Sequence, residues 1–183
     1  MRIAAKGSTE ADARALISPV EAEVRQRLGD FIFGSDQETL EGVVERRLER
    51  FGARVALVEL GTAGVIAERL GVGAGKVFAG GMILGGLQET RWLGADLPPE
   101  AAPEEKARLL ARAIRQWGSV EVGAASVVEG VPESQPPTVA VGIAVSLDGR
   151  EEGRAHTFGG DLPSIRIRAA TLTLDLLRRT IPD

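Results

Sequence analysis

The sequence predicts an α/β fold of three layers (α/β/α), in which a mixed, mainly parallel sheet lies between two layers of helices. Segments with helical periodicity alternate with short apolar runs along most of the chain, as in sheets built from strand–helix–strand units. One apolar run, residues 54–59, leads directly into a helix start at Thr62. The dipeptide Asp148-Gly149 predicts a single late hairpin, which adds antiparallel pairing to the sheet.

The first 34 residues are predicted to form a separate, short N-terminal β-α-β appendage. Its expected strands are Arg2–Lys6 and Phe31–Phe33. The spacing Thr9-x-x-Asp12 resembles a capping box and therefore begins the intervening helix, which Pro19 is expected to kink or restart. Because a piece of this size is too small to bury a core alone, we expect it to dock on the rest of the chain or to belong to a larger unit.

Residues 35–183 are predicted to form the α/β domain itself. Ser35-x-x-Glu38 resembles a second capping box, and Gly52 is a typical helix stop. Amphipathic spacing predicts a helix from about Glu104 to Trp117. The other expected elements are the strands 54–59, 76–84, 120–128, 138–146 and 151–158 and the helices 62–70, 87–93 and 164–179.

The composition restricts the classes of function. A net charge of −4 argues against a general surface for nucleic acid or anionic membrane. The absence of cysteine excludes disulfides and thiolate chemistry, and a single histidine, His156, argues against a Ser-His-Asp triad and a histidine-rich metal site. No apolar run approaches the roughly 20 residues of a membrane span, and no signal peptide precedes the first strand. We therefore expect a cytoplasmic protein without a metal or cofactor.

Several conspicuous residues have structural interpretations. The segment Gly71–Lys76 resembles a phosphate-binding loop, but it is one residue short and Val77 stands where a magnesium-binding hydroxyl is needed, so a turn is predicted. Trp92 and Trp117 are expected to be core or interface anchors. His156 is expected to be a surface or hydrogen-bonded strand residue.

The candidate site lies where the run 54–59 ends, because open α/β sheets bind ligands where the carboxyl end of a strand meets a helix N-terminus. Thr62 is expected to cap the helix. As a nucleophile it would need a base, for which Glu59 is the nearby candidate, unless Glu59 is a buried or capping carboxylate. Ser126, near the end of another strand, is the alternative hydroxyl, and Asp161 either caps the last helix or contacts a ligand.

The predicted ligand-binding residues are Gly61, Thr62, Gly64, Asp161 and Arg166. Arg166 could form an anion pocket with Lys76 and Arg168.

Several segments carry a family resemblance: Ser35–Leu40; the turn with Glu59, Thr62 and Gly64; Gly80–Ile83; and Phe158–Asp161 with Ile165-Arg166 and Leu176–Arg179. They are similar to the opening helix, the Glu-Ser-Cys-Thr-Gly-Gly turn, the second strand and the closing segment of the C-terminal domain of the CinA (competence-damage-inducible) family. Residues 1–34 resemble the end of the CinA middle domain. The resemblance implies a homodimer and the hydrolysis of nicotinamide mononucleotide to the nicotinate nucleotide and ammonia.

The residues that should carry this amidase chemistry differ here. The family's serine nucleophile falls on Leu60, and the segment that supplies a tyrosine and an activating lysine falls on Leu84–Thr90. The chain has no tyrosine, and no lysine lies between Lys76 and Lys106. The family's Gly-Ile-Ala-Gly-Pro loop is replaced by residues 127–131, and Leu162 stands in place of an arginine. A serine–lysine amidase needs an unprotonated amine beside its hydroxyl, so this mechanism is not expected.

Three hypotheses of function arise from these residues. The favoured one is a catalytically degenerate CinA-like domain, a pseudoenzyme that acts as a nucleotide-binding or oligomerisation module. The alternative is an active amidohydrolase on nicotinamide mononucleotide or a related amide, with a relocated nucleophile at Thr62 or Ser126. The third is a fragment whose first 34 residues normally pack against further sequence, with exposed apolar surface around Phe31–Phe33.

Overall fold

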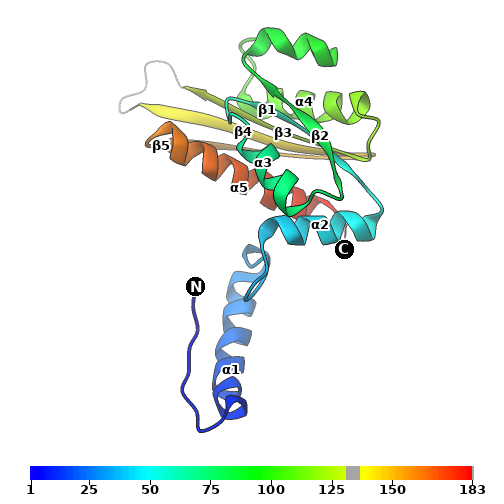
Figure 1. The fold of residues 1–183 in the computed structure, drawn as a ribbon. Coiled ribbons are helices and arrows are strands. Elements are labelled where there is room, and N and C mark those ends of the chain that lie inside the picture. Colours follow the sequence, from blue (N-terminus) through cyan, green and yellow to red (C-terminus); the bar gives the residue numbers. More distant parts are fainter. Residues whose placement is uncertain (131–136, 183) are drawn as a thin grey trace. The chain divides into compact units, whose positions relative to one another are not determined.

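The computed structural model describes residues 1–130 and 137–182 and divides into two compact units, Met1–Gln37 and Glu38–Asp183 (Figure 1). Each unit has its own secondary structure. The first contains helices alone, whereas the second contains a sheet with helices on both faces. Within the described residues, no helix is both long enough and apolar enough to cross a membrane.

The N-terminal unit consists of α1 (Glu10–Leu28) and the short 3-10 helix η1 (Gly29–Phe31). The predicted capping box is confirmed, because the Thr9 hydroxyl accepts from the Asp12 amide and the Asp12 carboxylate accepts from the Thr9 amide, each at 3.1 Å. The predicted restart at Pro19 is wrong, since α1 runs through this residue as one helix.

The two strands predicted for this unit, Arg2–Lys6 and Phe31–Phe33, do not form among the described residues. Phe31 ends η1, and Ile32 after it has extended dihedral angles but no ladder partner. Two short segments cannot sustain a sheet without partner strands and a core to cover, which explains the difference.

The sheet of the second unit has the strand order β2-β1-β3-β4-β5 in the described part of the chain. Strand β1 pairs in parallel with β2 and β3, whereas the β3–β4 and β4–β5 pairs are antiparallel. The sheet is mixed as predicted, although its pairs divide evenly between parallel and antiparallel. The strands are β1 (Val55–Leu60), β2 (Phe78–Leu84), β3 (Val122–Gly130), β4 (Thr138–Leu147) and β5 (Arg150–Gly159).

Helices cover both faces of this sheet, which confirms the three-layer prediction (Figure 1). Three helices lie on one face, and one helix with a 3-10 segment lies on the other. Their side chains form one apolar core on each side of the sheet. The first face carries α2 (Leu40–Phe51), α3 (Val65–Gly73) and α5 (Leu162–Thr180), and the second carries α4 (Pro103–Trp117) and η2 (Leu87–Leu93).

Local signals determine most of these elements. The hairpin at Asp148-Gly149 is confirmed, because Leu147 pairs with Arg150 and Gly149 adopts φ +69°. Gly52 ends α2 in the left-handed conformation, as predicted.

Two predictions about the same unit need correction. Helix α2 begins after Thr39 rather than at Ser35, since the Thr39 hydroxyl accepts from the Gly42 amide at 3.1 Å. Trp92 and Trp117, expected to be core or interface anchors, are not core residues, because each is 60% exposed, and the interface role stays a prediction.

Candidate functional site

The candidate site is the edge of the sheet at which β1, β2, β3 and β5 all end. These four strands run in the same direction, because β5 is antiparallel to β4 and β4 is antiparallel to β3. Helices α3 and α5 follow β1 and β5 and therefore begin at this edge. Helix α4 also begins near this edge. Its first residue, Pro103, lies against Gly142 of β4, and Gly142 pairs with Val127, which lies near the end of β3.

Glu59, the penultimate residue of β1, is fully buried and holds the N-terminus of α3. Its Oε1 accepts from the Ala67 amide at 2.7 Å, and its Oε2 accepts from the amides of Gly64 at 3.1 Å and Ile66 at 3.3 Å. A carboxylate at a helix N-terminus is stabilised both by these hydrogen bonds and by the helix dipole. Glu59 is therefore a buried carboxylate that caps α3, which is one of the two roles considered for it.

Because Glu59 takes this position, the start of α3 lies later than predicted. The N-cap residue is Gly64, with φ +89° and no side-chain hydrogen bond, and the first helical residue is Val65 rather than Thr62. The turn between strand and helix has three further residues, of which Gly61 and Ala63 also have positive φ, +85° and +59°. The prediction that Thr62 caps α3 is therefore wrong.

Thr62 and Ser126 are both fully buried, and the Oγ1 of Thr62 and the Oγ of Ser126 have no hydrogen-bond partner among the described residues. Ser126 is the register partner of Glu59 on the neighbouring parallel strand, so the two side chains project from the same face of the sheet. No hydrogen bond joins Ser126 to Glu59, whose carboxylate is directed to the α3 amides. Neither hydroxyl is accessible to a substrate outside the protein in this structure.

Asp161 and Arg166 make contacts within the fold. The Asp161 carboxylate caps α5 by accepting from the Ser164 amide at 2.9 Å, and this hydrogen bond holds the pKa of Asp161 below its ordinary value. Arg166 donates from Nε to the carbonyl oxygen of Gly61 at 2.8 Å and so ties α5 to the turn after β1. The structure thus brings Arg166 and Gly61 together and leaves Asp161 exposed at the start of α5.

The predicted grouping of three cations does not occur. Arg168 lies over the ring of Phe158, 5.7 Å from its centroid, and Lys76 pairs with Glu49 at 3.7 Å. His156, in β5, stacks on Phe158 with the ring centroids 5.9 Å apart. In the described ranges, no group of three or more histidine and acidic side chains is arranged to hold a metal ion.

A buried ion pair that was not predicted from the sequence lies at the same edge, on the face covered by α4. Lys106 is almost fully buried, and its Nζ donates to both carboxylate oxygens of Glu129 at 3.0 Å. The burial of Lys106 could have been predicted from the sequence, because Lys106, Leu110 and Ile114 follow one another at intervals of four residues and therefore share the inner face of α4. This amine therefore faces a carboxylate and is not hydrogen-bonded to a serine or threonine in the described part of the chain.

Sequence comparisons find relatives over nearly the whole chain. Residues 1–34 match the model of the damage-inducible protein CinA KH domain. The CinA-like protein of Kosmotoga olearia is 30% identical over 99% of this chain and 46% of its own length, and that of Myxococcus xanthus is 32% identical over 98% and 45%. The chain spans about half the length of these relatives.

Solved structures resemble most of this chain. A CinA superfamily protein from Klebsiella pneumoniae superimposes with a TM-score of 0.69 at 20% identity, covering 78% of this chain and 95% of that one. One from Escherichia coli gives 0.65 at 20%, with 83% and 98% covered. The architecture is therefore the α/β fold of the CinA superfamily. Taken with the family model and the sequence relatives, it assigns the chain to the CinA family.

Proposed function

We propose that the chain is a catalytically degenerate CinA-like domain that has no amidase activity and acts as an assembly module. The observation that carries the proposal is the arrangement of Glu59, whose two oxygens accept three amide hydrogen bonds from α3. A general base needs a free lone pair within reach of the proton that it removes. Glu59 makes no hydrogen bond to Ser126 or Thr62. Among the described residues, the one buried amine at this edge is that of Lys106, which is paired with Glu129.

The helix N-termini at this edge also argue against the nucleotide-binding form of the hypothesis. A helix N-terminus attracts phosphate through free amides and a positive dipole end. At α3 the Glu59 carboxylate already occupies that position, and at α5 the Asp161 carboxylate does the same. The first turn of α4 carries Glu104 and Glu105. Because all three termini have acidic side chains, an anionic ligand would meet repulsion at each of them.

Support for the assembly role comes from the surface of the same unit. Trp92 of η2 and Trp117 of α4 are each 60% exposed, and both elements lie on the same side of the sheet. Exposed aromatic side chains of this size are enriched at protein interfaces. The homodimer expected from the family resemblance stays a prediction, and light scattering on the purified chain measures it.

A second candidate, an active amidohydrolase with Ser126 as nucleophile, has one observation in its favour. Ser126 and Glu59 are register partners on adjacent strands, so a rearrangement of the α3 N-terminus would place a carboxylate beside a hydroxyl. Such a rearrangement would have to break three hydrogen bonds to a charged group, each contributing about 1.5–3 kcal/mol. This cost makes the second candidate the weaker one.

Ammonia release from nicotinamide mononucleotide distinguishes the two candidates. We expect wild type, Ser126→Ala and Thr62→Val all to release ammonia at the rate of buffer alone, because neither the Ser126 nor the Thr62 hydroxyl is hydrogen-bonded to a base in the described part of the chain. Circular dichroism checks that the variants fold, as expected for the loss of buried hydroxyls without partners. Turnover by wild type that Ser126→Ala removes would establish the hydrolase instead, and turnover that both variants retain would also contradict the proposal.

A further inference from the structure

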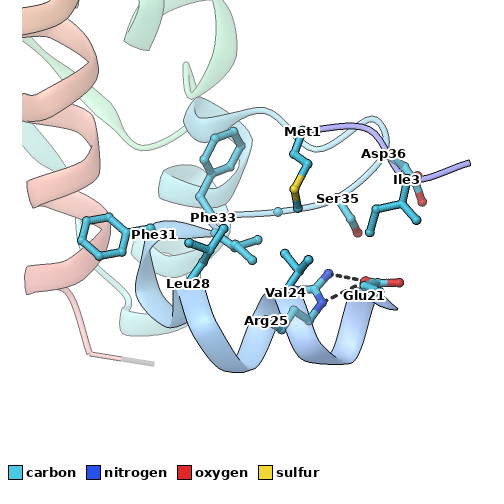
Figure 2. Close-up of a pocket in the computed structure, with 12 residues that line it drawn as sticks. Met1, Ile3, Glu21, Val24, Arg25, Leu28, Phe31, Phe33, Ser35 and Asp36 are labelled. Carbon is cyan, nitrogen blue, oxygen red and sulfur yellow. Dashed lines mark hydrogen bonds and ion pairs between the residues drawn. The ribbon is translucent and has the colours of Figure 1, made fainter. Parts of the chain in front are cut away.

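Two hollows in the described part of the surface differ in the charge that they present to a ligand. The N-terminal unit has a groove of about 530 Å³ with mostly apolar lining residues, and Figure 2 shows its charged side chains, Glu21 and Arg25, paired with each other. In the second unit, a hollow of about 280 Å³ lies between the last turns of α4 and the β4–β5 hairpin. This second hollow is cationic, although the net charge of the chain is −4. Its charged lining residues are Arg112, Arg115, Arg150 and Glu151.

This cationic hollow lies at the opposite edge of the sheet from the candidate site. Ser146, which also lines it, is almost fully buried and pairs with Gly123 at the start of β3 and with Glu151 of β5. Paired residues project from the same face of a sheet, so Ser146 and Glu151 lie side by side on the face that α4 covers. A ligand in this hollow would therefore bind independently of Glu59.

The ion pairs of the described residues neutralise these arginines unequally. Arg112 pairs closely with Glu151, with 2.7 Å between its Nη2 and Oε2. Arg115 has a long pair with Asp148, 3.7 Å from Nη1 to Oδ1, and the Asp148 side chain is fully exposed. Because solvent screens an exposed pair of this kind, it contributes little. The Arg115 side chain is only 21% exposed, so the protein holds a half-enclosed positive charge that it neutralises weakly.

Two side-chain atoms of this lining are buried without a hydrogen-bond partner. They are Nε of Arg115, a donor, and Oε1 of Glu151, an acceptor, and they are two of the four such atoms among the described residues. The other two are the hydroxyls of Thr62 and Ser126 at the candidate site. Burying a polar group without a partner is costly, so such groups usually have a partner in the functional state. A ligand that suits both atoms must offer anionic oxygens to the arginine and a hydroxyl donor to the carboxylate.

We infer that the cationic hollow binds a phosphate group on an ion or small molecule that also carries a hydroxyl, either inorganic phosphate or a polyol phosphate. The guanidinium groups of Arg115 and Arg150 match phosphate oxygens in charge and geometry. The hydroxyl, on phosphorus or on carbon, donates to Oε1 of Glu151. Sulfate resembles inorganic phosphate in shape and charge but has no hydroxyl at neutral pH, so Glu151 repels it without compensation.

Isothermal titration calorimetry at pH 7 and low ionic strength tests the inference on the full chain, with inorganic phosphate, glycerol 3-phosphate and sulfate as probes. We expect a Kd below about 1 mM for at least one of the two phosphates and binding of sulfate that is at least about fivefold weaker. The tighter of the two phosphates identifies the source of the group. No measurable binding of either phosphate at about 10 mM overturns the inference, and so does sulfate that binds as tightly as both.

Three arginine variants locate the site, and circular dichroism checks their folding. We expect Arg115→Gln to weaken phosphate binding at least about tenfold. Arg150→Gln removes a more exposed charge, whose pair with Glu152 is 3.7 Å long, and should weaken binding at least about threefold even if Arg115→Gln does not fold. Arg91→Gln is the matched control, since Arg91 is an exposed arginine of η2 outside the hollow, and it should change the Kd less than about twofold. Equal weakening by Arg91→Gln overturns the inference, because binding would then follow net charge alone.

Glu151→Gln separates recognition of the hydroxyl from the effect of charge. Removing a negative charge favours both anions, so the informative quantity is the ratio of the two Kd values. We expect the preference for phosphate over sulfate to fall from at least about fivefold to less than about twofold. A preference that Glu151→Gln leaves unchanged overturns the role of Glu151 and with it the inference. None of these measurements depends on ammonia release, so this inference and the proposed function fail separately.

Discussion

Replacing Glu59 with alanine is expected to destabilise the domain by about 3–5 kcal/mol. The side chain is fully buried and is the acceptor for three amides at the start of α3. Removing it leaves these donors without partners, one of them deeply buried, and also creates a cavity in the core. Urea denaturation followed by circular dichroism measures the change, and the loss should appear as a lower midpoint at an unchanged slope.

Glu68→Ala provides the matched control for this prediction. Glu68 lies in the first turn of the same helix but is exposed and makes no hydrogen bond to the helix amides among the described contacts. Its loss should change the free energy of unfolding by less than about 0.5 kcal/mol. Equal stabilities of the two variants would mean that Glu59 does not anchor α3 and is free for another role.

The second large effect is expected for Gly61→Ala, in the turn that joins β1 to α3. Gly61 has φ +85°, and an added Cβ would lie against the carbonyl oxygen of Val128, far inside van der Waals contact. The backbone of β3 cannot move aside as a flexible side chain would. We therefore expect Gly61→Ala to lower the free energy of unfolding by about 2–5 kcal/mol, because backbone strain and overpacking act together.

Gly52→Ala separates these two contributions. Gly52 has a similar φ, +70°, but a Cβ there would meet no atom within 4 Å. We expect Gly52→Ala to lower the free energy of unfolding by only about 1 kcal/mol, which is the cost of the left-handed conformation. Thermal unfolding of both variants measures the difference. A Gly61→Ala protein as stable as Gly52→Ala would show that the turn can move away from β3.

The sequence predicted the elements whose signals are local. The Asp148-Gly149 turn, the stop at Gly52 and the capping box at Thr9 each depend on a few neighbouring residues. The alternation of helical and apolar segments along the chain also predicted the three-layer order. The direction of strand pairing was predicted less well. The β4–β5 pair follows from the predicted hairpin, whereas the antiparallel β3–β4 pair was not expected, and residues 131–136 between these two strands lie outside the described structure.

The candidate site was harder to predict because its important contacts join distant parts of the chain. Glu59 was proposed as a base or a cap, and only the fold shows that its oxygens reach amides five to eight residues later. The Arg166 bond to Gly61 and the Lys106 pair with Glu129 span 105 and 23 residues. Local spacing carries no direct information about such contacts. The strand predictions for residues 1–34 failed for a related reason, since a strand needs a partner that local sequence does not supply.

Amide hydrogen exchange at residues 61–67, with and without nicotinamide mononucleotide, tests the central claim most directly. That claim is that the chain's own carboxylate fills the position where a substrate anion would bind. Because the Gly64, Ile66 and Ala67 amides donate to Glu59, we predict that they exchange slowly and that millimolar nucleotide leaves their rates unchanged. Fast exchange at these amides, or rates that fall when the nucleotide is added, would contradict the account.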